Sequence, residues 1–179
     1  YQTNFADRID GGFGTDTLEL NFNFVTTYQI GDGAVNSIER LFLRANAQDN
    51  TLSISAAQWR SISSVETSAP NWAPIHLSIR GDGGDLSLTN LQTGSRFGQV
   101  NLTGSFRNIV TTDAAVNIDS VWQFDNITLG AGADRLVVRQ DSLFSASAGG
   151  GDDTIFFIGS TLAAIIDGGT GNDTLDLSQ

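Results

Sequence analysis

Four short stretches rich in glycine and aspartate contain the residue types that could bind a metal ion. DGGFGTD lies near the beginning of the sequence, at 10–16, and DGGTGND lies near its end, at 167–173. Related stretches, TLGAGAD at 128–134 and SAGGGDD at 147–153, lie between them. Aspartate carboxylates and backbone carbonyl groups are oxygen ligands, which hard cations such as calcium prefer. The four stretches are therefore candidate cation-binding turns.

The last three stretches recur at a nearly constant spacing. Their final residues are Asp134, Asp153 and Asp173, which are 19 and 20 residues apart. Each aspartate is followed at once by a strand-like segment rich in apolar residues. A fixed period near 20 residues is typical of proteins that stack one structural unit on the next. One such unit, or rung, cannot bury its apolar face alone, so neighbouring rungs must cover it.

The rest of the chain also favours strands. Apolar residues occupy every second position in segments such as 18–24, which is the period of a β-strand. Helix signals are almost absent, and 57–79 contains both prolines, Pro70 and Pro74, but no turn in phase with the others. We therefore expect a single all-β domain over 1–179, a right-handed parallel β-solenoid, with an irregular insertion or interruption near 57–79.

Glycine is the residue that allows two such turns to stack closely. The pattern G-G-x-G-x-D leaves little room for side chains, and glycine accepts the positive φ angles that a tight turn requires. When two turns of this kind lie on adjacent rungs, several carbonyl oxygens and two carboxylates converge between them. That arrangement is an all-oxygen cage, which suits calcium.

Two segments resemble a known family of calcium-binding repeats. DGGFGTDTLEL at 10–20 and DGGTGNDTLDL at 167–177 resemble the nonapeptide repeats of the RTX family, also called hemolysin-type repeats. The resemblance is good at 148–157 and weaker at 129–138. It implies a β-roll or β-helix whose glycine-aspartate turns bind Ca²⁺. The family carries the motif on both edges of each rung, whereas this chain carries it on one edge, so the resemblance implies calcium on that edge only.

The resemblance assigns ligand roles to these turns residue by residue. The carboxylate ligands would be Asp16, Asp134, Asp153 and Asp173. The glycines that supply carbonyl oxygens would be Gly12, Gly14, Gly130, Gly132, Gly149, Gly151, Gly169 and Gly171. Two complete sites follow, one between Asp134 and Asp153 and one between Asp153 and Asp173. Asp16 is expected to pair with Asn36, whose neutral amide is a poorer ligand. Metal binding by RGDGGD at 80–85 stays open, because this turn is out of register with its following strand.

The overall composition excludes several classes of function. The net charge is −11, all nine basic residues are Arg, and all but three of the 20 acidic residues are Asp. Nucleic-acid binding is disfavoured because the sequence has no basic patch that could release the counterions from nucleic-acid phosphates. The sequence contains no Cys and no apolar run of the length that a membrane span needs, so we expect neither disulfides nor a membrane-spanning segment.

Other residues that could do chemistry have simpler explanations. His76 is the only histidine, which argues against a zinc site or a Ser-His-Asp triad, and we expect it in a loop beside Pro74. Asp113, Asp119 and Asp125 could form an acid/base set on a solenoid face, but acidic turns explain them more simply.

Three tryptophans keep a carbohydrate function open. Trp59, Trp72 and Trp122 could form a platform on which sugars stack, although tryptophans in such positions more often pack against the flank or the end of a solenoid. The alternative function is therefore a β-helix that binds or cleaves an extracellular polysaccharide.

The favoured function is structural rather than enzymatic. We expect a calcium-binding module of a secreted or cell-surface bacterial protein, such as an adhesin, a surface layer or an extracellular filament, which folds when it binds calcium. The near-identity of the first and last motifs suggests two kinds of neighbour for the end rungs. These are further rungs of a longer chain, or another copy that joins end to end.

Overall fold

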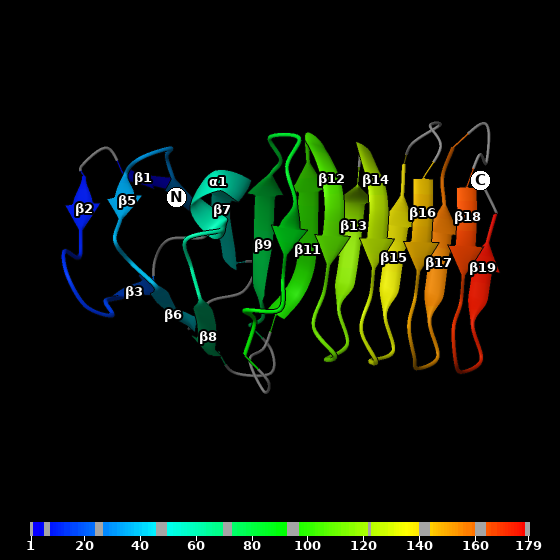
Figure 1. The fold of residues 1–179 in the computed structure, drawn as a ribbon. Coiled ribbons are helices and arrows are strands. Elements are labelled where there is room, and N and C mark those ends of the chain that lie inside the picture. The colour runs from blue at the N-terminus through cyan, green and yellow to red at the C-terminus, as the bar shows by residue number, and fades with distance from the viewer. Residues whose placement is uncertain are drawn as a thin grey trace. The chain divides into compact units, whose positions relative to one another are not determined.

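The protein is a parallel β-solenoid (Figure 1). The computed structural model describes residues 2–5, 8–23, 27–45, 50–69, 73–92, 97–121, 123–139, 144–159 and 164–177. Every strand pairing recorded among these residues is parallel, and their only helix is α1 (Ala56–Trp59). The all-β solenoid predicted from the repeat is therefore confirmed. Contacts divide the chain into two compact units, which we call the first unit (Tyr1–Arg80 with Asn90–Gln99) and the second unit (Gly81–Thr89 with Val100–Gln179).

The second unit consists of parallel strands that belong alternately to two sheets. One sheet contains, in spatial order, β10 (Leu86–Ser87), β12 (Ser105–Val110), β14 (Gln123–Thr128), β16 (Phe144–Ser147) and β18 (Ala164–Asp167). The strands of the other are β13 (Asn117–Val121), β15 (Arg135–Val138), β17 (Thr154–Phe157) and β19 (Thr174–Asp176), preceded by β11 (Phe97–Thr103), which begins in the first unit. The glycine-aspartate turns lead from β14 to β15, from β16 to β17 and from β18 to β19.

The register of these strands confirms the spacing read from the sequence. Arg135 lies opposite Thr154, and Thr154 lies opposite Thr174, so each residue after a turn aspartate pairs with its equivalent on the next rung. Inward-facing side chains form columns along the stack, and Leu136 and Ile155 in one such column are buried. The core thus forms between rungs, because every rung covers the apolar face of its neighbour.

The first unit has three sets of parallel strands. One set is β1 (Gln2–Phe5), β4 (Thr27–Ile30), β7 (Asn50–Ser55) and β9 (Ile75–Arg80). The second is β2 (Ile9–Asp10) with β5 (Val35–Asn36), and the third is β3 (Thr17–Phe22), β6 (Arg40–Ala45) and β8 (Ser64–Ser68). The turn at 11–16 connects β2 to β3. The alternation in β3 and β6 places Leu20, Phe22, Leu41 and Leu43 in the core.

The segment expected to interrupt the solenoid contains both an irregular element and regular strands. Ser55 caps α1 by accepting the N–H of Gln58 at 3.3 Å, and Trp59 at the end of this short helix is buried. Strands β8 and β9 nevertheless pair in register with β6 and β7. Pro70 and Trp72 lie outside the described residues.

One prediction about this segment is wrong. His76 was expected in a loop, but it lies within β9, where its Nδ1 accepts the backbone N–H of Gln99 at 3.0 Å. A strand forms there because Ile75, Leu77 and Ile79 alternate into the core, which outweighs the effect of the preceding proline.

The helix α1 is far too short to cross a membrane, and the described residues include no other helix.

Candidate metal centre

Asp134, Asp153 and Asp173 lie directly above one another on successive rungs of the second unit. The backbone N–H of Asp134 donates to Oδ1 of Asp153 at 2.7 Å, and the N–H of Asp153 donates to Oδ1 of Asp173 at 3.1 Å. Asp134 Oδ1 in turn accepts the N–H of Val116 at 2.8 Å. Each carboxylate therefore bonds to the rung before it, and we call these three residues the aspartate ladder.

The second oxygens of the ladder lack partners. Asp134 and Asp153 are 3% and 1% exposed, and Oδ2 of each is buried without any hydrogen-bond partner among the described residues. The pKa of Asp134 is raised to about 6, chiefly by burial and to a lesser extent by the nearby charge of Asp153, while the hydrogen bond from the N–H of Val116 opposes the shift. A buried carboxylate oxygen without a donor is costly. A proton or a cation at these oxygens would remove the cost.

Glycine carbonyl groups of each turn lie close to the glycines of the next turn. Gly149, Gly151, Gly169 and Gly171 all have positive φ angles, between 83° and 138°. A Cβ atom on Gly149 would collide with the carbonyl oxygen of Gly130, and one on Gly171 would collide with that of Gly151. The carbonyls of one turn therefore point at the backbone of the next turn, and only glycine permits this approach.

Gly130 and Gly132 are required for lack of space rather than for a positive φ angle. They are not among the residues with positive φ, which agrees with the weaker motif at 129–138. A Cβ atom on Gly130 would collide with the carbonyl of Thr112, and one on Gly132 with the backbone of Ala115. Their role in the stack is to leave space for the turn before them.

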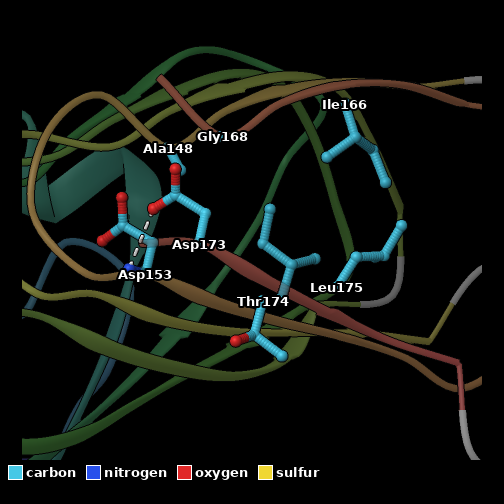
Figure 2. Close-up of a pocket in the computed structure, with 8 residues that line it drawn as sticks. Ala148, Asp153, Ile166, Gly168, Asp173, Thr174 and Leu175 are labelled. Atoms are coloured by element: carbon cyan, nitrogen blue, oxygen red, sulfur yellow. Dashed lines mark hydrogen bonds between the residues drawn. The ribbon is translucent and has the colours of Figure 1, made fainter. Parts of the chain in front are cut away.

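Figure 2 shows the last step of the ladder. Asp153 and Asp173 lie side by side on adjacent turns, joined by the hydrogen bond from Asp153 N–H, with Gly168 next to Asp173. These residues line a cavity of about 220 Å³ together with Ala148, Ile155, Ile166, Thr174 and Leu175. The cavity combines two carboxylates with an apolar floor, and Asp173 itself is exposed.

The first unit repeats the ladder with a residue that the sequence did not suggest. Gly12 and Gly14 have φ angles of 86° and 120°, as the motif predicts. The N–H of Asp16 donates to Oε2 of Glu39 at 3.0 Å, and Oδ2 of Asp16 is buried without a partner among the described residues. Glu39 thus takes the place that Asp153 takes next to Asp134.

The expected pairing of Asp16 with Asn36 is wrong. Asn36 lies opposite Asp10, at the end of the β2–β5 pair, and its amide donates to the carbonyl of Gly33 at 2.9 Å. The backbone bond from Arg40 N–H to the carbonyl of Asp16 sets the register instead, because it is equivalent to the bond from Thr154 N–H to the carbonyl of Asp134. The residue on the next rung that corresponds to Asp16 is therefore Glu39, which precedes Arg40.

The turn RGDGGD at 80–85 does not offer its last carboxylate as a ligand. Arg107 binds Asp85 through two nitrogens, at 2.8 and 2.7 Å, and Asn108 donates to the same carboxylate at 2.8 Å. The hydrogen bonds from Arg107 and then Asn108 lower the pKa of Asp85 to about 2. Asp85 is thus an exposed ion-pair partner rather than a ladder residue.

The other candidate residues do not converge on a second site. Trp59 is 1% exposed, so it cannot serve as a platform for sugars, and Trp72 and Trp122 lie outside the described residues. Asp119 lies on β13, whereas Asp125 lies on β14 in the other sheet. Within the part of the chain that the structure describes, no three acidic or histidine side chains gather into a metal-binding group.

An ion at the ladder would therefore depend on backbone oxygens as well as carboxylates. The available donors are all oxygen, and calcium takes six to eight oxygen ligands that commonly include backbone carbonyls. The carbonyls of Gly130 and Gly149 already accept N–H groups from neighbouring turns, at 3.0 Å each, but a carbonyl oxygen has a second lone pair. The residues present thus fit calcium in ligand type.

The fold and these turns define the chain as a parallel β-solenoid with stacked glycine-aspartate turns. No family model, no curated protein and no solved structure matches this chain.

Proposed function

We propose that this chain is a calcium-binding structural module of a secreted or cell-surface bacterial protein, similar to the RTX β-roll. The observation that carries the proposal is the repeated buried carboxylate oxygen that has no hydrogen-bond partner among the residues the structure describes, at Asp16, Asp134 and Asp153. These three aspartates occur in both units, and each is the last residue of a glycine-aspartate turn, which favours a shared ligand over a local packing defect. The role is structural, in an adhesin, a surface layer or a filament, rather than catalytic.

The ladder residues would hold the ion from two adjacent rungs. Asp134 and Asp153 would hold one ion through their Oδ2 atoms, Asp153 and Asp173 would hold another one rung further, and Asp16 and Glu39 would each contribute a carboxylate oxygen in the first unit. The glycine carbonyls of the same turns would complete the ligand set. Bound calcium would supply positive charge to carboxylates that otherwise repel one another at close range.

Calcium binding would add directly to the stability of the fold. The stacked turns exist only in the folded chain, so free energy of binding becomes free energy of folding. Extracellular calcium modules bind with dissociation constants of about 10⁻⁴–10⁻³ M, which suits a protein that folds after it leaves the cell. A net charge of −11 makes the calcium-free state still less favourable.

Calorimetric titration with calcium and with magnesium tests the proposal. The wild type should bind calcium and discriminate against magnesium, which prefers a rigid octahedral site with several waters. Asp153→Asn should bind fewer calcium ions, because Asp153 belongs to both steps of the ladder. Asp125→Asn removes an exposed carboxylate on β14 and should bind as the wild type does. A wild type that binds no calcium, or equal binding by all three proteins, would contradict the proposal.

A further inference from the structure

The outer face of the β3–β6–β8 sheet in the first unit carries a cluster of charged side chains around an aromatic ring. The three strands lie side by side (Figure 1). Strand β6 alternates between buried and more exposed residues, so Arg40, Phe42 and Arg44 face outward. In the strand register, Phe42 lies between Glu19 of β3 and Glu66 of β8. Two positive and two negative side chains therefore lie around Phe42.

The charged side chains form two separate ion pairs. Nη2 of Arg40 donates to Oε1 of Glu66 at 3.0 Å, and Nε of Arg44 donates to Oε1 of Glu19 at 2.6 Å. Hydrogen bonds from Arg44 and then from Asn21 lower the pKa of Glu19, so its carboxylate is ionised at neutral pH. The four paired side chains are 39–48% exposed, which leaves them within reach of a ligand. Because the pairs already hold these side chains in place, a ligand pays less ordering entropy on binding.

Each ion pair keeps hydrogen-bonding capacity for a ligand. Each pair joins one carboxylate oxygen to one guanidinium nitrogen. The second oxygens of Glu19 and Glu66 can accept hydrogen bonds, and the remaining N–H groups of Arg40 and Arg44 can donate them. A hydroxyl group both donates and accepts, so a ligand with several hydroxyls can bind both kinds of group at once.

A hollow of about 250 Å³ lies over this cluster. The two ion pairs and Phe42 line it together with Thr17 and Leu41. The guanidinium carbon of Arg44 lies 4.7 Å from the centroid of the Phe42 ring, a distance at which cation and ring attract each other and hold the ring in place. An apolar surface beside a few convergent polar groups is the usual composition of a small-ligand site. The hollow has room for a single sugar ring.

The charges of the hollow favour a neutral ligand. Its lining residues include two Arg and two Glu, so their formal charges cancel. An anion would have to displace a glutamate from its arginine, and a cation would have to displace an arginine from its glutamate. The net charge of −11 on the whole chain also repels anionic polymers. A neutral ligand with several hydroxyls needs no such displacement, because it can add to the pairs as they stand.

We propose that this hollow binds one ring of a neutral saccharide, as part of an extracellular polysaccharide. The C–H face of the sugar ring packs against Phe42, and its hydroxyls bind the second oxygens of Glu19 and Glu66 and the remaining N–H groups of the two arginines. The site binds rather than cleaves, because both carboxylates are ion-pair partners of arginine and no other general acid is among the described residues that line the hollow. None of these residues is a proposed calcium ligand, so the inference goes beyond the proposed function.

Calorimetric titration with short saccharides in millimolar calcium tests the site. The probes are maltohexaose, cellohexaose, mannohexaose and galactohexaose, with oligogalacturonate as an anionic comparison. The wild type should bind at least one neutral probe, and it should bind that probe more tightly than oligogalacturonate.

Two variants and a matched control locate the binding. Phe42→Leu keeps an apolar side chain but removes the ring, and it should weaken binding by roughly two- to tenfold. Arg44→Met removes a charged donor and should weaken binding by roughly tenfold or more. Arg107→Met is the control, since Arg107 forms the same kind of exposed ion pair with Asp85 but does not line the hollow. It should bind as the wild type does, and circular dichroism checks that all three variants keep the β-fold.

The outcomes separate this inference from the proposed function. A wild type that binds calcium but none of the neutral probes would overturn the saccharide site alone. Tighter binding of oligogalacturonate than of any neutral probe would also overturn it, as would equal affinity of Arg44→Met, Arg107→Met and the wild type. A wild type that binds a neutral probe but no calcium would support the saccharide site and contradict the proposed function.

Discussion

Asp153→Ala removes the acceptor that joins two rungs of the ladder. Asp153 Oδ1 accepts the N–H of Asp134 at 2.7 Å, and both residues are buried. Alanine leaves this donor unpaired, which costs about 1–3 kcal/mol. In a chain of this length, 1 kcal/mol corresponds to about 2–4 °C in Tm, so we expect Tm in chelator to fall by roughly 2–12 °C.

Asp153→Asn separates the hydrogen bond from the charge. The asparagine side chain keeps an oxygen that can accept the N–H of Asp134, but it carries no charge at the position where Oδ2 lacks a partner. In chelator this variant should therefore lose less stability than Asp153→Ala. With calcium at a hundred times its dissociation constant, the wild type gains about 2.7 kcal/mol per site, and Asp153→Asn should lose most of the gain from the sites it shares.

Thermal melts followed by circular dichroism would distinguish these effects. The wild type, both Asp153 variants and Asp125→Asn would each be melted in chelator and in millimolar calcium. The reasoning predicts a large loss in both buffers for alanine, and a loss mainly in calcium for asparagine. It would be refuted if the two Asp153 variants behaved identically in both buffers, or if Asp125→Asn lost the calcium response as well.

Three further predictions concern other residues. Gly171→Ala should destabilise the fold by at least about 1 kcal/mol in denaturant titrations and by more than Gly12→Ala, because both glycines have positive φ but only the Cβ on Gly171 would collide with another turn. The raised pKa of Asp134 makes the folded state bind its proton more tightly than the unfolded state does. In chelator, the wild type should therefore lose stability relative to Asp134→Asn as pH rises from about 4 to about 6. The calcium-induced rise in Tm should instead become smaller as pH drops below about 6. The opposite trends would contradict the raised pKa of Asp134. Trp59→Ala should cost about 3–5 kcal/mol in calcium and in chelator alike, since Trp59 is a core residue; a small cost would show that it does not support the fold.

The ladder in the second unit could be predicted from the sequence because its chemistry is local. Only glycine accepts both the positive φ and the close approach of the next turn, so Gly149, Gly151, Gly169 and Gly171 mark the turns directly. The spacing of Asp134, Asp153 and Asp173 then gives the register, which the pairing of β15, β17 and β19 confirms. The right-handed coil and the calcium ligands stay predictions.

Glu39 could not be predicted in the same way. Its turn contains Ser37 with a φ of 51° where the motif would have glycine, and it lies 23 residues after Asp16. A glutamate side chain is longer than an aspartate side chain, so it reaches Asp16 N–H from a turn of different shape. The signal that could have found it is the strand that follows, since Arg40-Leu41 aligns with Thr17-Leu18.

Long-range strand pairing also explains why His76 lies in a strand rather than in a loop. The nearby prolines suggested a loop, but the in-register contact of β9 with β7 buries Ile75, Leu77 and Ile79. That burial depends on a strand more than 20 residues earlier in the sequence. The alternation of Ile75, Leu77 and Ile79 is the local signal that could have predicted the strand.

The melting temperature of the wild-type chain in calcium, in magnesium and in chelator tests the central claim most directly. If calcium fills the gaps between stacked glycine-aspartate turns, Tm should rise with calcium concentration by more than it does with magnesium, and chelator should reverse the rise. Equal melting temperatures in all three buffers would contradict the claim.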